Sequence, residues 1–241
     1  MNRLDNARRT QILAALCEGA SVNATARQTG VSKVTILKLL AEIGEVCLTY
    51  QRATLVNLPC KRAQCDEVWS FVGAKERNVP RDERGRGRGD TWIWVGTCAD
   101  TKVVPCFHVG ARDADAAAYF MEDLASRLAN RVQLTTDGHN AYLSAVEGAF
   151  GWNGIDYRAA EPHHAKEHAS PERLTNGLSK KLENHRHALA LQYMYNNFCR
   201  SHETLTKANR GIKTTPAMAS GVADHAWEVS EVVALLEASE K

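Results

Sequence analysis

The sequence predicts an α/β protein, in which a mixed β-sheet with flanking helices follows a small all-α domain. Short segments with alternating apolar and polar residues predict the strands, and longer segments with apolar residues at helical spacing separate the later strands. The first 50 residues show helical spacing, which predicts the all-α domain.

The composition is that of an ordinary globular protein, because 44% of the 241 residues are hydrophobic and 24% are charged. The net charge is only +2, so binding to nucleic acid has to rest on local basic patches. No apolar run approaches the roughly 20 residues needed to span a bilayer, and the first residues lack the apolar core of a signal peptide. Seven scattered cysteines, an odd number, argue against a disulfide framework. We therefore expect a cytoplasmic protein with buried thiols.

Three short helices are expected near the start of the chain, over 7–18, 23–29 and 33–47. Ser32 is placed to cap the third helix, and the tight connection from Gly30 to Ser32 is typical of a helix-turn-helix. Three polar residues of the third helix are expected to face outward and to meet phosphates or base edges: Lys33, Thr35 and Lys38. A plain three-helix bundle with a solvated polar face has the same spacing, and this alternative stays open.

Strands and helices alternate in the rest of the chain. The expected strands cover 64–72, 91–98, 103–109, 132–136 and 155–158, and the expected helices cover 113–130, 140–150 and a long segment from Ser170. This order (three strands, helix, strand, helix, strand, helix) is that of a ribonuclease H-like fold. A polar run over 75–90 contains five arginines and three glycines. It predicts a hairpin arm, which is either a solvated tip or a contact to a DNA backbone.

These elements divide the chain into four parts. We expect a helix-turn-helix domain over 1–50, a linker over 51–63, a ribonuclease H-like domain over 64–221 and a C-terminal acidic helix over 222–241. The acidic helix has an apolar face that can dock on the domain or on a second subunit. A local basic cluster precedes it and is a second candidate for holding a phosphate backbone: Arg200, Lys207 and Arg210.

Two strand aspartates are the candidate metal ligands. Asp137 follows the strand over 132–136, at the carboxyl end where α/β sheets place their ligands, and Asp66 lies inside the first strand. Side by side, they would hold divalent metal for phosphoryl transfer, with two ions about 4 Å apart serving the nucleophile and the leaving oxygen. Carboxylate oxygens select Mg²⁺ or Mn²⁺ over zinc. The alternative for either residue is a helix cap or a surface charge.

A third acid is expected from the long helix. Glu172 and Glu183 are 11 residues apart, so they lie on nearly the same helical face and the spacing leaves the choice open. His139 lies next to this group in sequence, two residues after Asp137. It either positions a phosphate or the attacking water, or serves the local turn.

Two motifs resemble those of a known family. The segments 60–72 (CKRAQCDEVWSFV) and 133–142 (QLTTDGHNAY) resemble the aspartate motifs of DDE transposases of bacterial insertion sequences, most closely the family named after insertion element one. Further matches lie at 174–185, 195–202 and 215–219. The resemblance implies a ribonuclease H-like catalytic domain, magnesium, and cut-and-join chemistry on double-stranded DNA at the terminal repeats by a homo-oligomer. It transfers the catalytic and metal-binding roles to Asp66 and Asp137.

One stretch departs from the family pattern. The family's catalytic glutamate sits in a Glu-Arg-x-Asn motif well before the Leu-Thr-Asn motif, whereas here Glu172-Arg173 runs directly into 174–176. The chain therefore looks internally shortened, and the resemblance carries the third catalytic and metal-binding role to Glu172. Two rival functions follow: a shortened, inactive copy that acts as a DNA-binding repressor, and a ribonuclease H-like nuclease that does not join strands.

Overall fold

A five-stranded mixed sheet forms the centre of the protein. The computed structural model describes residues 4–83, 87–151, 155–159 and 181–240. The strands are β1 (Arg62–Val72), β2 (Gly89–Cys98), β3 (Phe107–Gly110), β4 (Val132–Thr136) and β5 (Ile155–Ala159), in the spatial order β3-β2-β1-β4-β5. β1, β2 and β3 pair antiparallel, whereas β4 is parallel to both β1 and β5. This mixed sheet is compatible with the predicted ribonuclease H-like fold.

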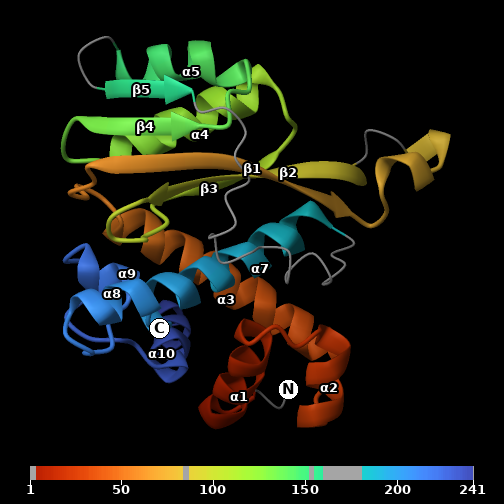
Figure 1. The fold of residues 1–241 in the computed structure, drawn as a ribbon. Helices are drawn as coiled ribbons and strands as arrows, with labels where there is room; N and C mark the ends of the chain where they lie inside the picture. The colour runs from red at the N-terminus through yellow and green to blue at the C-terminus, as the bar shows by residue number, and fades with distance from the viewer. Residues whose placement is uncertain (1–3, 84–86, 152–154, 160–180, 241) are drawn as a thin grey trace.

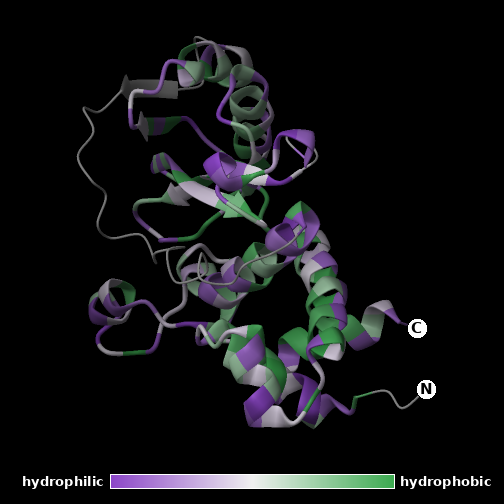
Figure 2. Ribbon diagram, turned by 90° about the vertical axis from the view of Figure 1, so that its right-hand side faces the viewer, coloured by the Kyte–Doolittle hydropathy of each residue, from purple (hydrophilic) through white to green (hydrophobic). Residues whose placement is uncertain are grey.

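Helices cover both faces of the sheet (Figure 1). The helices α4 (Ala114–Arg127) and α5 (Ala141–Phe150) lie on one face, and α3 (Lys33–Thr54) and α7 (Leu182–Met194) lie on the other. The α4/α5 side is packed around Trp94, Phe120 and Tyr142, which are fully buried. Figure 2 shows hydrophilic and hydrophobic residues interspersed along the helices, as expected for helices with one face on a core.

β1 changes its buried face halfway along its length, and this change positions the candidate site. Ala63 and Cys65 are buried in the α4/α5 core, whereas Ser70 is buried against α7, where its hydroxyl is 3.1 Å from His185 Nε2. Successive side chains of a strand point to opposite faces. Asp66 and Glu67 are consecutive, so their side chains start from opposite faces of the sheet. They lie at the point where the strand passes from one core to the other.

The predicted turn between the second and third helices is present residue for residue. α1 (Asn6–Cys17) is followed by α2 (Val22–Thr29), which ends at Gly30 in the left-handed conformation, with φ of 69°. The Ser32 hydroxyl accepts the N–H of Thr35 and caps α3. These caps explain why the sequence defines the ends of these helices so well.

α3 differs from the sequence expectation because it continues to Thr54, across the expected domain boundary at residue 50. Its second half packs along α7, and the two helices touch at Gly44, where an added Cβ would lie 2.4 Å from the Cβ of His187. The C-terminal helix α10 (Val229–Ser239) packs on α1 and α3. The first part of the expected linker is therefore helical and packed against the sheet domain.

The remaining described elements are short. The arm between β1 and β2 contains the 3-10 turns η1 (Glu76–Asn78) and η2 (Arg81–Glu83), and α7 continues into the π-helical turn η3 (Tyr195–Cys199), α8 (Glu203–Ala208) and α9 (Pro216–Ala219). The strand expected over 103–109 begins only at Phe107, because Pro105 lacks an N–H and the Val104 N–H donates to Asn197 instead of the sheet. The expected start of the long helix at Ser170 lies outside the described residues. Among the described helices, none is both long enough and apolar enough to cross a membrane.

Candidate metal centre

Asp137 is fixed by a tight turn directly after β4. Its Oδ1 accepts the N–H of His139 at 3.0 Å, and the Gly138 N–H donates to Thr136 Oγ1 at 3.3 Å. Gly138 has φ of 83°, a conformation that favours glycine, so the sequence Asp-Gly-His suits this turn. The turn thus holds the carboxylate at the carboxyl end of a buried strand, the position expected from the sequence.

The structure brings Asp66 and Asp137 together and adds a third acid that the sequence prediction did not include. One carboxylate oxygen from each of Asp66, Glu67 and Asp137 lies within 4.8 Å of the others. Asp66 Oδ1 also accepts the backbone N–H of Glu67 at 2.9 Å. Two acids therefore come from β1 and one from the end of β4.

Glu67 is the most buried of the three acids, because its side chain is 0% exposed. Burial and the neighbouring charge of Asp137 raise its pKa to about 7. Its Oε1 is buried and has no hydrogen-bond partner within the described part of the chain. An acid at an apolar position of the strand alternation, on the face of Cys65 and across from Trp94, is the sequence signal that could have identified it.

A cation already faces two of these carboxylates. Arg112 Nη2 lies 3.3 Å from Glu67 Oε2 and 3.3 Å from Asp137 Oδ2. The guanidinium carbon lies 4.6 Å from the centre of the Trp92 ring, a cation–π contact. Arg112 follows β3 in a short connection, and nothing in its local sequence pattern singles it out.

The donor set fits a hard divalent cation. It consists of carboxylate oxygens only, which Mg²⁺, Mn²⁺ and Ca²⁺ prefer over softer ligands. The buried Oε1 of Glu67 favours binding of a cation, since it has no hydrogen-bond partner among the described residues and a buried carboxylate oxygen without a partner is costly. We conclude that Asp66, Glu67 and Asp137 can hold a divalent ion.

The two candidates for the helix acid are placed differently. Glu172 lies outside the described residues. Glu183 is exposed in the first turn of α7 and lines a cavity of about 460 Å³ with Glu45, His108 and His187. Within the described residues, the carboxylate cluster does not include Glu183.

Three polar residues of α3 were expected to face outward, and their exposure differs. Lys33 and Lys38 are exposed on α3, whereas Thr35 is half-buried and its hydroxyl lies 2.9 Å from the Ser32 hydroxyl. Thr35 therefore also takes part in the helix cap. Two apolar residues that the prediction left out are exposed beside the lysines: Val34 at 63% and Leu37 at 39%.

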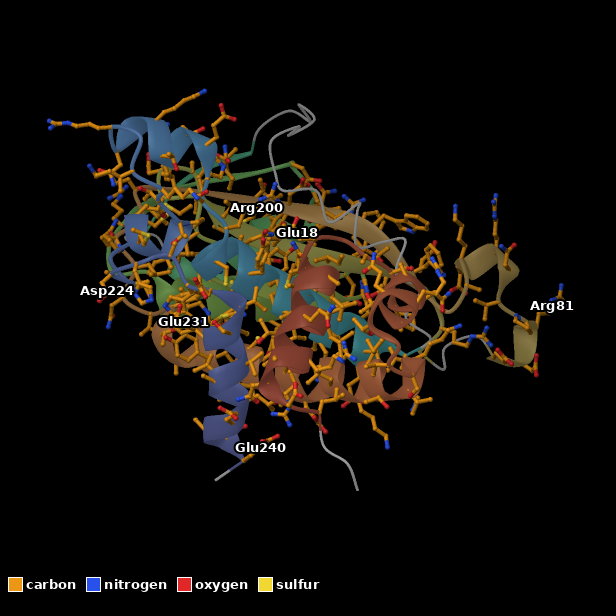
Figure 3. All side chains as sticks on the ribbon, turned by 90° about the horizontal axis from the view of Figure 1, so that it is seen from below. Glu18, Arg81, Arg200, Asp224, Glu231 and Glu240 are labelled. Carbon is orange, nitrogen blue, oxygen red and sulfur yellow. The ribbon has the colours of Figure 1, made fainter. Side chains whose placement is uncertain are left out.

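The second group of basic residues lies around α8. Arg200, Lys207 and Arg210 are exposed or nearly so, and Lys207 pairs with Glu203 at 2.5 Å. Figure 1 shows α8 below one end of the sheet, whereas β4 runs toward the opposite end. The arm lies at that opposite end, and Figure 3 shows Arg81 projecting far from the body of the molecule.

Comparison with known proteins gives no family assignment. No protein-family model matches the chain, and no curated protein matches it. Among solved structures, a crystal structure of the Mos1 strand transfer complex is 15% identical, with all of this chain aligned to 78% of that chain at a TM-score of 0.31. A pre-cleavage Mos1 transpososome is 11% identical, with all of this chain aligned to 80% of that chain at a TM-score of 0.29. Likeness at this level assigns neither a fold nor an activity.

Proposed function

We propose that this protein is a DDE-type transposase that binds the terminal repeats of an insertion sequence and catalyses metal-dependent strand cleavage and strand transfer. One observation carries the proposal: Asp66 in the central strand and Asp137 at the end of the adjacent parallel strand meet in one carboxylate cluster. That arrangement suits phosphoryl transfer, which needs divalent metal positioned by carboxylates. The two motifs that resemble insertion-sequence transposases contain these same two residues.

In the proposed mechanism, Asp66 and Asp137 hold the metal, and Glu172 supplies the third acid of the site. A Mg²⁺ or Mn²⁺ ion held there would supply Lewis-acid chemistry for water or a 3′-hydroxyl as nucleophile and for the leaving oxygen. Glu67 adds buried negative charge on the side of the site that faces Trp94 and Tyr142. The turn at 137–139 keeps the Asp137 carboxylate in place during the reaction, because its Oδ1 is held by a backbone N–H.

DNA would be held by two separate surfaces. Lys33 and Lys38 on α3 are placed to meet phosphates, while the exposed Val34 and Leu37 between them are placed to meet base edges, such as a thymine methyl group. The arm would add a basic surface for the DNA backbone, because its described arginines, Arg77, Arg81 and Arg88, are exposed. Because transposition joins two ends of one element, we expect a homo-oligomer that acts on the nucleoid in the bacterial cytoplasm.

The test uses a labelled duplex containing the inverted repeats that flank this chain's own coding sequence, with Mg²⁺ or Mn²⁺. We expect the wild type to nick the duplex at the repeat end and Asp137→Asn to bind the duplex without cutting it. Asp115→Asn, an exposed acid in the first turn of α4, is the matched control and should cut normally.

The same assay separates the rival functions. Wild-type binding with no cutting in either metal would contradict the transposase and support a repressor formed by an inactive copy. Cutting without any joined product, when a second unlabelled duplex is supplied as target, would support a nuclease. Glu172→Gln that cuts normally would remove the third role from Glu172.

A further inference from the structure

Arg112 contacts the carboxylate cluster, and the proposed reaction assigns no role to it. It lies in the connection between β3 and α4, outside every strand and helix, and its side chain is 35% exposed. Its guanidinium nevertheless reaches Glu67, whose side chain is completely buried, and Asp137 at the same time. A partly exposed arginine that bridges two acids of the cluster is placed to compensate their repulsion.

The bridge uses the oxygens that a metal ion would need. Arg112 Nη2 contacts Glu67 Oε2 and Asp137 Oδ2 at 3.3 Å each, longer than the roughly 2.7–2.9 Å of strong charge-assisted hydrogen bonds. A divalent ion binds carboxylate oxygens at about 2.0–2.6 Å, so it outcompetes such a bridge when it reaches these oxygens. The guanidinium and a metal at these two oxygens are therefore alternatives.

Trp92 contacts the guanidinium of Arg112 while this group bridges the carboxylates. The indole ring lies 4.6 Å from the guanidinium carbon and is part of β2, directly across from Trp69 of β1. A stacked guanidinium keeps the N–H groups of its edge available, and those groups match the oxygens of a phosphate in pairs. The ring thus holds a phosphate-binding group beside the metal centre.

We propose that Arg112 is an exchangeable cation of this centre, which neutralises Glu67 and Asp137 before metal binds and then binds a phosphate of the DNA strand that is cut. The inference rests on the proposed function for its second step only. The first step, exchange between guanidinium and metal, concerns the metal-free protein and needs no DNA.

The test therefore has two independent readouts. In the absence of DNA, Mn²⁺ binding is titrated by the electron paramagnetic resonance signal of free Mn²⁺. Arg112→Gln should bind Mn²⁺ about fivefold more tightly than the wild type, since one competing ion pair of this exposure is lost. Arg52→Gln, an exposed arginine on α3, is the matched control and should leave the affinity unchanged.

The second readout is cutting of the labelled duplex at saturating Mn²⁺. Arg112→Gln should lower the cleavage rate at least about tenfold although it holds metal more tightly, which a merely structural loss would not produce. Arg112→Lys should keep part of the rate, because it retains a point charge without the paired N–H groups. Trp92→Leu should lower the rate without the fivefold gain in Mn²⁺ affinity.

Each result bears on a separate step. Unchanged or weaker Mn²⁺ binding by Arg112→Gln would overturn the exchange. Tighter Mn²⁺ binding with a normal cleavage rate would overturn the phosphate contact and leave the exchange standing. A wild type that binds Mn²⁺ but cuts no DNA would overturn the proposed function and, with it, the phosphate contact, while the affinity difference would still decide the exchange.

Discussion

Burial makes the three acids of the metal centre unequal. The side chain of Asp137 is 28% exposed, whereas that of Glu67 is fully buried beside it. Burial penalises the charged form of Glu67, and the nearby charge of Asp137 adds to this effect. The pKa of Glu67 therefore rises to about 7 in the metal-free folded protein. A folded-state pKa above the unfolded value lowers stability as pH rises from 4.5 through 7.

Replacing Glu67 with Gln should therefore stabilise the metal-free protein at pH 8 by about 2 kcal/mol, because the amide carries no charge that burial can penalise. Urea unfolding of both proteins at pH 5 and pH 8 measures this difference. At pH 5 the two should differ little, since Glu67 is largely protonated in the folded state. Glu147→Gln, an exposed residue of α5, is the control. Equal free energies of unfolding for the wild type and Glu67→Gln at pH 8 would contradict a buried charge on Glu67.

A buried histidine gives a pH dependence of the opposite sign. Burial lowers the pKa of His185, which lies at the start of α7 against Ser70. The unfolded chain takes up a proton near pH 6.5 while the folded protein stays neutral there, so His185 costs stability as pH falls below 6.5.

Between pH 7.5 and 5.5, the wild type should lose more stability than His185→Gln, whose amide can still bond to Ser70. Chemical unfolding at the two pH values measures this loss. His225→Gln is the contrasting control: Asp224 and Glu231 raise the pKa of His225, so its contribution is present at low pH and disappears as pH rises. A wild type and His185→Gln with parallel pH profiles would show that His185 can become charged in the folded protein.

At the scale of single elements, the close approach of α3 and α7 depends on one small residue. Gly44 lies in the middle of α3 against the backbone and Cβ of His187. The sequence shows Gly44 only as a residue of low helix propensity within a helical pattern. The structure explains the glycine by packing, because a side chain at this position would push α3 and α7 apart.

Gly44→Ala should destabilise the protein by about 2 kcal/mol, since the added methyl overlaps His187 and the two helices cannot both keep their positions. Gly148→Ala is a matched helical substitution in α5, where nothing lies within 4 Å of the added Cβ. It should stabilise by up to about 1 kcal/mol through helix propensity. Thermal unfolding of the two variants gives the comparison. If both substitutions changed the melting temperature in the same direction, the packing role of Gly44 would be contradicted.

The elements that the sequence predicts best are those with local signals at their ends. The strand over 132–136 and the turn from Gly30 to Ser32 are found as predicted, because alternation and capping are encoded within a few residues. Glu67 and Arg112 were not predicted, because their roles arise from contacts with Asp137, 70 and 25 positions away. Asp137 could be predicted since its position at the end of a strand is local.

At the scale of the whole molecule, α3 connects the N-terminal helices to the sheet. Gln51 near its end is buried and donates to the carbonyl of Ala190 in α7, and the buried Arg127 of α4 donates to the carbonyls of Gln51 and Leu55. Gln51 and Leu55 lie at the start of the expected linker. No pattern in 51–63 indicates such contacts, because each one depends on a partner more than 70 positions away.

The buried core is also continuous from the first helix to the last. Ile12 and Leu13 of α1, Leu124 of α4 and Leu236 of α10 belong to one cluster of buried residues. Because α1 has few apolar partners apart from α2, α3 and α10, its stability depends on elements from both ends of the chain.

The metal-free protein should therefore unfold in a single transition, with equal calorimetric and van't Hoff enthalpies. Leu13→Ala, which opens a cavity worth about 2–5 kcal/mol in α1, should lower the temperature of that whole transition. Differential scanning calorimetry measures both quantities, with Leu143→Ala on the exposed face of α5 as the control. Two transitions, with only the first shifted by Leu13→Ala, would instead show that the N-terminal helices unfold independently. A single transition would mean that α3 couples the N-terminal helices to the sheet, so that a substitution in either part changes the stability of both.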